Sequence, residues 1–237
     1  MVPPFIELTN LTKNFGNGKG IFDLSFGVQQ GEVFGFLGPN GAGKSTTIRH
    51  LMGFMKPQSG SCQIMGKDCF SQAALIQQSV GYLAGEIAFI EDMSGISYLN
   101  FIADMKGIRD RSSIRDLLYR FELNPRGKIK KMSKGMKQKI GLVAAFMGDP
   151  SVLILDEPTS GLDPLMQNRF VELLLERKKK GSTVFMSSHI FEEVEKTCNR
   201  TAIIREGRLV DIVQMKELSK LRNRIYTVTL HDKESAQ

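Results

Sequence analysis

A glycine-rich stretch directly after an apolar run constrains this chain more than any other feature of its sequence. The stretch runs from Gly38 to Thr47 and follows Val33–Leu37. A glycine, four free positions and then Gly-Lys-Ser form the pattern of a phosphate-binding P-loop. Glycines let the backbone curl so that several N–H groups converge on phosphate oxygens, and the next helix directs its positive end at the same anion. The chain is therefore predicted to contain a strand–loop–helix unit that binds a nucleoside triphosphate.

Each position of this loop has an expected role. Lys44 is expected to reach the terminal phosphates, and Ser45 to take a place on Mg²⁺. The helix is expected over Ile48 to Met55. The other residues predicted to cradle the nucleotide are Gly38, Pro39, Asn40, Gly41, Ala42, Gly43 and Thr46.

Composition is that of an ordinary globular protein. The 237 residues are 41% hydrophobic and 24% charged, which suits one α/β domain or one domain with an inserted subdomain. Three cysteines without metal-ligand spacing are expected to be reduced, as in the cytosol. No apolar stretch approaches the roughly 20 residues that cross a bilayer. If the protein works at a membrane, another chain is expected to span it.

The net charge of +7 is unevenly distributed. Between Glu122 and Asp149 there is no acidic residue. The basic residues of this run are Arg126, Lys128, Lys130, Lys131, Lys134, Lys137 and Lys139. A solvated helix face is the default reading, and the others are an anion site, nucleic acid or anionic lipid. From Arg126 to Lys139 there is no aromatic residue to stack on bases, which argues against single-stranded nucleic acid.

Periodicity predicts an α/β core interrupted by helices. Strands are expected at Phe5–Leu11, Ile21–Val28, Ser79–Leu83, Val152–Leu155, Thr183–Ser187, Arg200–Ile204 and Arg208–Ile212. Further helices are expected at Gly95–Lys106, Ser112–Phe121, Lys134–Met147, Pro164–Lys179 and Ile190–Thr197. We assign 1–84 and 148–215 to the core, 85–147 to the helical subdomain and 216–237 to a C-terminal tail. A strand-like stretch at 225–230 is either part of a short tail or, the reading we favour slightly, the start of a truncated subdomain.

Two carboxylates close the apolar strand that begins at Val152. In a parallel sheet, the carboxyl end of a strand lies at the ligand crevice. Asp156 suits the Mg²⁺ shell, directly or through water. Glu157 is then placed to polarise a water for in-line attack on the γ-phosphate.

The order of these motifs resembles that of ABC-family ATPases. It consists of the P-loop, Met132-Ser133-Lys134-Gly135-Met136, Leu155-Asp156-Glu157-Pro158, Ser160-Gly161-Leu162-Asp163 and Ser188-His189. The resemblance covers about Ile6 to Val213. It implies the ABC ATPase fold, an α/β fold in which a P-loop NTPase core carries an antiparallel β subdomain and a helical insertion. It also implies ATP and Mg²⁺ as cofactors.

Further roles follow from the same resemblance. Glu157 would be the general base, and His189 the switch histidine that contacts the γ-phosphate. Asp163 resembles the residue that communicates across a dimer. Phe15 occupies the place of an aromatic that stacks on adenine, although phenylalanine beside a β-turn is more often a core residue.

The signature segment departs from the family pattern. Ser133 and Gly135 are kept, whereas Lys134 replaces a glycine and Met136 a glutamine. Ser133 is expected to cap a helix whose first-turn lysines oppose the helix dipole, by roughly 0.3–1 kcal/mol each. An anion arriving from outside would relieve that cost. In the family, this anion is the γ-phosphate of ATP bound to the partner subunit.

A second departure lies at the boundary between core and helices. Gly85 stands where the family places a glutamine that senses Mg²⁺ and links the two lobes. Glycine has no side chain for this role, and whether Glu86 replaces it, through water, stays open. Gly85 would also loosen the hinge between the two parts.

The resemblance implies the ATP-binding and ATP-hydrolysing subunit of a transporter. Two copies would close head to tail on ATP and move a separate transmembrane permease at the inner face of the cell membrane. The stretch Gly81 to Gly95 resembles bacterial ABC-2-type exporters for antibiotics, drugs or lipids, and the permease is expected to dock near Gly85 to Ser97. The alternative is a soluble ABC ATPase acting on nucleic acid or the ribosome. A single cassette with a short helical insertion fits this alternative poorly.

Overall fold

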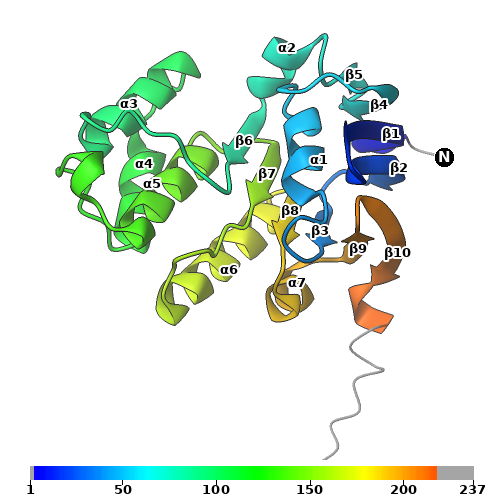
Figure 1. Ribbon diagram of the computed structural model, residues 1–237. Coiled ribbons are helices and arrows are strands. Elements are labelled where there is room, and N and C mark those ends of the chain that lie inside the picture. Colours follow the sequence, from blue (N-terminus) through cyan, green and yellow to red (C-terminus); the bar gives the residue numbers. More distant parts are fainter. Residues whose placement is uncertain (1–2, 218–237) are drawn as a thin grey trace, which may run out of the picture.

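The computed structural model describes residues 3–217, which form two β-sheets with helices around them (Figure 1). The larger sheet contains, in spatial order, β10 (Arg208–Gln214), β9 (Arg200–Arg205), β3 (Val33–Leu37), β8 (Thr183–Ser188), β7 (Val152–Asp156) and β6 (Val80–Leu83). All neighbours pair in parallel except β10, which is antiparallel to β9. The carboxyl ends of β3, β7 and β8 therefore lie side by side along one edge of the sheet.

Both faces of this sheet are buried, because alternate residues of each strand point to opposite sides. On one face, Phe34 and Phe36 of β3 pack with Phe185 of β8, at ring-centroid distances of 6.1 and 5.3 Å. On the other face, Leu153 and Leu155 of β7 join a second apolar cluster. Continuous apolar runs such as that of β7 are thus explained by burial on two sides.

The smaller sheet is antiparallel and has the order β2 (Lys19–Val28), β1 (Ile6–Gly16), β4 (Ser59–Ile64) and β5 (Lys67–Asp68). Its first hairpin turns at 16–18 as expected, but β1 extends five residues beyond the expected Leu11. We did not predict β4 and β5. The β4 sequence Ser-Gly-Ser-Cys-Gln-Ile is a weak strand pattern, and it is held as a strand by antiparallel pairing with β1.

Helix α1 spans Lys44–Leu51, so the expectation of a helix over Ile48 to Met55 was wrong at both ends. The chain enters the helix directly from Gly43, whose φ is +109°. The chain leaves the helix through Gly53, which is also at positive φ, and Phe54 N–H donates back to the carbonyl of Arg49. Because the P-loop and the helix are continuous, the helix N-terminus lies within the loop itself. A short helix, α2 (Ala73–Gln77), follows β5 and was not predicted.

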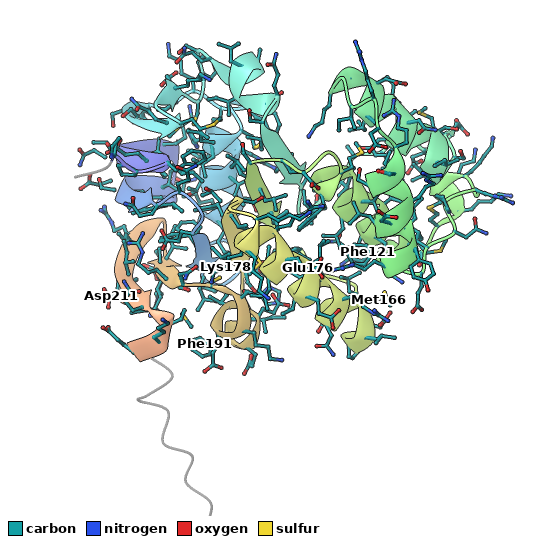
Figure 2. The ribbon with its side chains drawn as sticks, turned by 180° about the vertical axis from the view of Figure 1, so that it is seen from behind. Phe121, Met166, Glu176, Lys178, Phe191 and Asp211 are labelled. Atoms are coloured by element: carbon teal, nitrogen blue, oxygen red, sulfur yellow. The ribbon has the colours of Figure 1, made fainter. Side chains whose placement is uncertain are left out.

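Three helices form a group beside the sheets (Figure 1). They are α3 (Gly95–Met105), α4 (Ser112–Arg120) and α5 (Lys134–Phe146), with the short 3₁₀ helix η1 (Ile129–Lys131) before α5. Each α-helix begins at its expected residue and ends one residue early. Figure 2 shows Phe121 and Met166 where this group meets α6 (Pro164–Lys179), and Arg120 Nη2 donates there to Glu176 at 2.7 Å.

Helix α6 has the bounds expected from sequence. Asp163 caps its N-terminus by accepting from Met166 N–H at 3.0 Å, and Pro164 occupies the first turn. After β8, α7 (Phe191–Thr197) leads to the hairpin of β9 and β10, which turns at Glu206 and Gly207 as expected. The strand expected at 225–230 lies outside the described residues. Within residues 3–217, no helix is long and apolar enough to span a bilayer.

Candidate functional site

The P-loop connects β3 to α1 and closes tightly on its neighbours. Gly38 N–H donates to the carbonyl of Ser188 at 3.3 Å, so the loop is tied to the end of β8. A Cβ on Gly38 would lie 2.4 Å from the carbonyl oxygen of Ile204. Gly43 combines a φ of +109° with a position where a Cβ would lie 2.8 Å from Ile21 Cγ2. Side chains are excluded at both positions, which explains the glycines at the two ends of the loop.

Lys44 is the buried cation of the loop. Its side chain is 6% exposed, and Nζ donates to the carbonyl oxygens of Gly38 at 2.6 Å and Pro39 at 3.2 Å. The same Nζ lies 3.1 Å from Glu157 Oε1. The ammonium group is thus held at the mouth of the loop, next to the carboxylate that follows β7.

Asp156 and Glu157 lie at the end of β7 in different surroundings. Asp156 is 4% exposed and accepts from Ser187 Oγ of the neighbouring strand at 2.5 Å. Glu157 has a φ of +50°, a rare left-handed conformation for a non-glycine residue, and its N–H donates to the same Ser187 hydroxyl at 3.1 Å. This turn sends the Glu157 side chain towards the P-loop.

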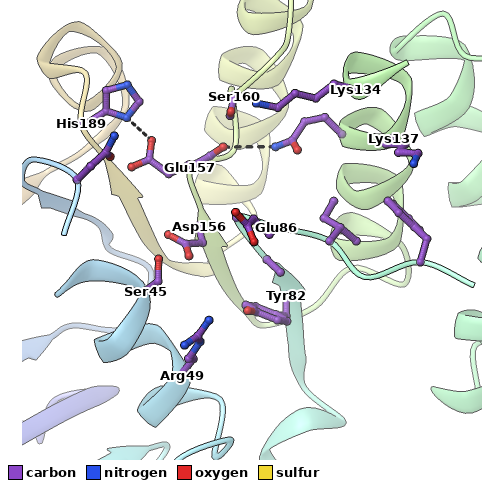
Figure 3. A pocket seen from close by; sticks show the side chains of 16 residues that line it. Ser45, Arg49, Tyr82, Glu86, Lys134, Lys137, Asp156, Glu157, Ser160 and His189 are labelled. Atoms are coloured by element: carbon purple, nitrogen blue, oxygen red, sulfur yellow. Dashed lines mark hydrogen bonds and ion pairs between the residues drawn. The ribbon is translucent and has the colours of Figure 1, made fainter. Parts of the chain in front are cut away.

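His189 follows β8 and completes a cluster around Glu157. Its Nδ1 lies 2.5 Å from Glu157 Oε2 (Figure 3). The two oxygens of Glu157 are therefore contacted separately, one by Lys44 and one by His189. Strands β3, β7 and β8 are adjacent, so the loops after them bring these three side chains together.

A cavity of about 430 Å³ lies beside the P-loop. Phe15, Lys19 and Gly20 line it together with Asn40, Gly41, Gly43–Thr46 and Glu157. Phe15 is 52% exposed, so it is not a core residue. An exposed aromatic ring beside a phosphate-binding loop is a surface on which a base can stack.

A larger cavity of about 710 Å³ lies between the sheet and α5 (Figure 3). Ser45, Asp156 and Glu86 all line it, so a hydroxyl and two carboxylates face one space. Oxygen donors of this kind suit Mg²⁺, which keeps several waters and also binds substrate phosphates. Gly85 lines the cavity as well, and a Cβ there would lie 3.1 Å from Asp156 Oδ2.

The remaining predicted residues lie on the far side of this cavity or outside it. Ser133 caps α5 by accepting from Met136 N–H at 3.2 Å, as expected. Lys134 lines the cavity, and a Cβ on Gly161 would contact its side chain at 3.3 Å. Asp163, the α6 cap, lines neither of these two cavities.

Three residues that sequence reasoning missed also line the larger cavity. Arg49 of α1 and Tyr82 of β6 lie near each other on one side of it (Figure 3). Gln138 of α5 lines it as well. Burial raises the pKa of the Tyr82 hydroxyl, and the negative charge of Asp156 adds to this. Gln138 is 5% exposed. A polar residue at a buried helix position was the signal that could have identified it.

The chain is similar in sequence to a known protein family and to several of its members. The family model described as ABC transporter matches residues 21–160. The bacitracin transport ATP-binding protein BcrA of Bacillus licheniformis is 38% identical over 226 residues, covering 93% of this chain and 73% of that protein. The probable multidrug ABC transporter ATP-binding protein YbhF of Escherichia coli is 33% identical over 86% of this chain, which spans 36% of YbhF.

Solved structures agree in fold. The structure of an ATP binding subunit of an ABC transporter superposes with a TM-score of 0.82 at 29% identity, covering 92% of both chains. The dimeric structure of the ABC transporter cassette MJ0796 gives a TM-score of 0.80 at 20% identity, covering 89% of this chain and 98% of the other. The expected fold class, a P-loop core with an antiparallel β subdomain and a helical insertion, is confirmed.

Proposed function

The chain belongs to the ABC transporter family as an ATP-binding and ATP-hydrolysing subunit, and from this premise we propose how its residues divide the reaction. Lys44, Glu157 and His189 form the catalytic part of an ATP site. The observation that carries this proposal is their convergence, with Lys44 Nζ and His189 Nδ1 at 3.1 and 2.5 Å from the two oxygens of Glu157. A cation, a carboxylate and an imidazole at one point suit hydrolysis of a phosphoanhydride.

The P-loop holds the triphosphate. N–H groups of the loop and the first turn of α1 bind phosphate oxygens, and Lys44 moves from the carboxylate of Glu157 to the terminal phosphates. Phe15 stacks on the adenine. This assignment is supported by the cavity that joins Phe15 to the loop. The loop residues proposed to contact the nucleotide are Gly38, Pro39, Asn40, Gly41, Ala42, Gly43, Ser45 and Thr46.

Ser45 and Asp156 would hold Mg²⁺, which neutralises charge on the phosphates. Both line the larger cavity, and the Asp156 carboxylate is oriented by Ser187 Oγ. Glu86 lines the same cavity and is proposed to act on the metal through water. It would replace the glutamine that the family has at the position of Gly85. Its presence beside Asp156 and Ser45 supports this assignment.

Glu157 acts as the general base. When Lys44 turns to the phosphates, one carboxylate oxygen becomes free to accept a proton from the attacking water. His189 holds the other oxygen and, at the end of β8, is placed to contact the γ-phosphate. The left-handed turn at Glu157 keeps the carboxylate at the crevice instead of letting it follow the strand.

The other half of the site comes from a second copy of the chain. The Ser133–Met136 segment begins a 13-residue helix whose first turn contains no acidic residue and a lysine at its first position. An anion at this N-terminus would be stabilised by the dipole and by Lys134. We assign this anion to the γ-phosphate of ATP held by the partner, with Asp163 communicating across the head-to-tail dimer.

Closure and opening of this dimer would drive a separate permease at the inner face of the membrane. The similarity to proteins named for bacitracin and multidrug transport supports export of an antibiotic, drug or lipid. The alternative, action on RNA or the ribosome, would use the basic run. Part of this run is neutralised, since Lys130 and Lys128 lie 2.6 and 3.8 Å from Asp92. This pairing favours the default reading of a solvated face.

A complementation experiment tests the head-to-tail site. Lys44→Ala removes the phosphate cation and Ser133→Arg blocks the signature helix, so each purified variant should be inactive. In a mixture, a heterodimer has one site with an intact P-loop from one chain and an intact signature from the other, so ATPase activity should return. A mixture as inactive as its components contradicts the composite site. Copurification with a membrane permease would support the transporter function. Salt-sensitive RNA binding would support the alternative.

A further inference from the structure

Gln138 of α5 is bonded directly to the backbone that carries Glu157. Its Nε2 donates to the carbonyl oxygen of Pro158 at 2.8 Å and approaches that of Glu157 at 3.3 Å. Both partners are acceptors, so the amide must present its NH₂ group to them. The side chain is 5% exposed, and no solvent replaces these bonds if they are lost.

The backbone of Glu157 needs such support because its φ of +50° is an unfavourable conformation. Its N–H is bonded to Ser187 Oγ at 3.1 Å, and its carbonyl accepts from Ser160 N–H at 3.1 Å and from Gln138. Gln138 is the member of this set that comes from the helical group and not from the sheet or the loop itself. The orientation of Glu157 therefore depends on where α5 lies.

The first turn of α5 packs closely on the same loop. A Cβ on Gly135 would lie 2.8 Å from the carbonyl oxygen of Gly161. The side chain of Lys134 also lies beside Gly161, where a Cβ on Gly161 would come within 3.3 Å of it. The beginning of α5 and the segment from Glu157 to Gly161 are thus in contact at several points.

The loop is also held from the opposite side. Thr159 Oγ1 donates to the carboxylate of Glu193 on α7, and Ser188 Oγ donates to the other oxygen of Glu193 at 2.8 Å. Ser188 immediately precedes His189. The Glu157 loop is therefore clamped between α5 and the segment that carries His189, with Gln138 as the polar link on the α5 side.

We propose that Gln138 is a positioning residue that fixes the Glu157 peptide of its own chain, so that the carboxylate is aimed for catalysis. The proposal rests on the function proposed above, in which Glu157 is the general base. It adds that the helix whose N-terminus serves the partner's ATP also orients the base of its own chain. Glu157 then responds to displacement of α5 when the partner's nucleotide binds or leaves.

Gln138→Met tests this link, because methionine keeps the length of the side chain and removes the donor. We expect kcat for ATP hydrolysis to fall about 10- to 100-fold, as for a small misplacement of a catalytic group, with KM for ATP within about twofold of wild type. Gln138→Glu places a carboxylate against two carbonyl oxygens, so its kcat should fall at least as far as that of Gln138→Met. Lys139→Ala, one position along α5, is the matched control and should keep wild-type kcat. The proposal is overturned if Gln138→Met leaves kcat unchanged, or if KM for ATP rises by the same factor as kcat falls.

Heterodimers separate an effect within the chain from one across the dimer. A chain with Glu157→Gln is paired with a wild-type chain, so turnover comes from the wild-type Glu157. Adding Gln138→Met to the wild-type chain should reduce this turnover about as much as in the homodimer, and adding it to the Glu157→Gln chain should not. Loss of turnover only when Gln138→Met is on the Glu157→Gln chain would place the effect on the signature helix and refute positioning within the chain. Normal turnover by the Glu157→Gln homodimer would instead contradict the proposed function itself.

Discussion

Replacing Glu157 by glutamine should strengthen the binding of ATP as well as abolish its hydrolysis. In the structure, the carboxylate of Glu157 holds the ammonium group of Lys44 at 3.1 Å. ATP must break this ion pair before Lys44 can reach the phosphates, and its triphosphate is then repelled by the nearby carboxylate. Glutamine removes both costs while keeping the size of the side chain.

The structure sets the size of the effect. Two unit charges at the 3.1 Å separation attract by about 1.3 kcal/mol in bulk water and about 5 kcal/mol at an effective dielectric constant of 20. The Glu157 side chain is 20% exposed and that of Lys44 6%, so solvent screens part of this attraction. Lys44 also keeps its bonds to the carbonyls of Gly38 and Pro39. We therefore expect a net gain of about 1–2 kcal/mol, or roughly 5- to 30-fold in Kd.

The assay is equilibrium titration with a non-hydrolysable ATP analogue, at protein concentrations where Kd does not depend on concentration, because dimer closure would add apparent affinity. Glu157→Asp is the matched control, since it keeps the charge and should gain less. Added salt should narrow the difference between wild type and Glu157→Gln. Equal or weaker binding by Glu157→Gln, or the same gain in Glu157→Asp, would refute the argument that the carboxylate competes with the nucleotide.

Three further changes test other parts of the molecule. Lys44→Ala should lose most ATP affinity in the same titration, and undiminished binding would count against the cradle. Gly85→Gln should raise the Mg²⁺ concentration needed for half-maximal activity, because any Cβ there would lie only 3.1 Å from Asp156 Oδ2. Gly85→Ala is the control and should raise this Mg²⁺ concentration equally. A difference between the two variants would reveal a role for the glutamine amide. Burial lowers the pKa of His50, against a hydrogen bond to Thr46 that raises it, and Nε2 is buried without a partner. The unfolded chain therefore binds the proton more readily, so the free energy of unfolding should be highest above the ordinary histidine pKa of about 6.5 and decline as the pH falls below it. In denaturant titrations at several pH values, His50→Gln should reduce this decline. The same dependence of unfolding free energy on pH in wild type and His50→Gln would contradict the argument.

Local chemistry predicted some elements closely and left others out. Helix α6 was predicted with its observed bounds, because Pro164 favours the first turn and a polar residue precedes it. Strand β4 was missed since its polar sequence becomes a strand only by pairing with β1. The helix expected to begin at Ile48 was predicted four residues too late, because the pattern of apolar residues does not reveal that α1 starts inside the P-loop.

The candidate site divides in the same way. The P-loop and the two carboxylates at the end of β7 were recognisable because each is a short run whose chemistry is set by neighbouring residues. Gln138 was not recognised, because its partners lie 19 and 20 positions away in another loop. The exposure of Phe15 also required the structure, since its sequence context favoured the core.

The sequence alone determined the phosphate-binding loop, the order of the motifs and the α/β character of the chain, because backbone preferences and apolar periodicity act over a few residues. Only the tertiary structure decided that one carboxylate is shared by Lys44 and His189, at 3.1 and 2.5 Å. This contact depends on the parallel pairing of β7 with β8 and β8 with β3, which aligns the ends of strands far apart in the chain. Such long-range pairing is selected by burial of both sheet faces, a property of the whole fold and not of any one segment.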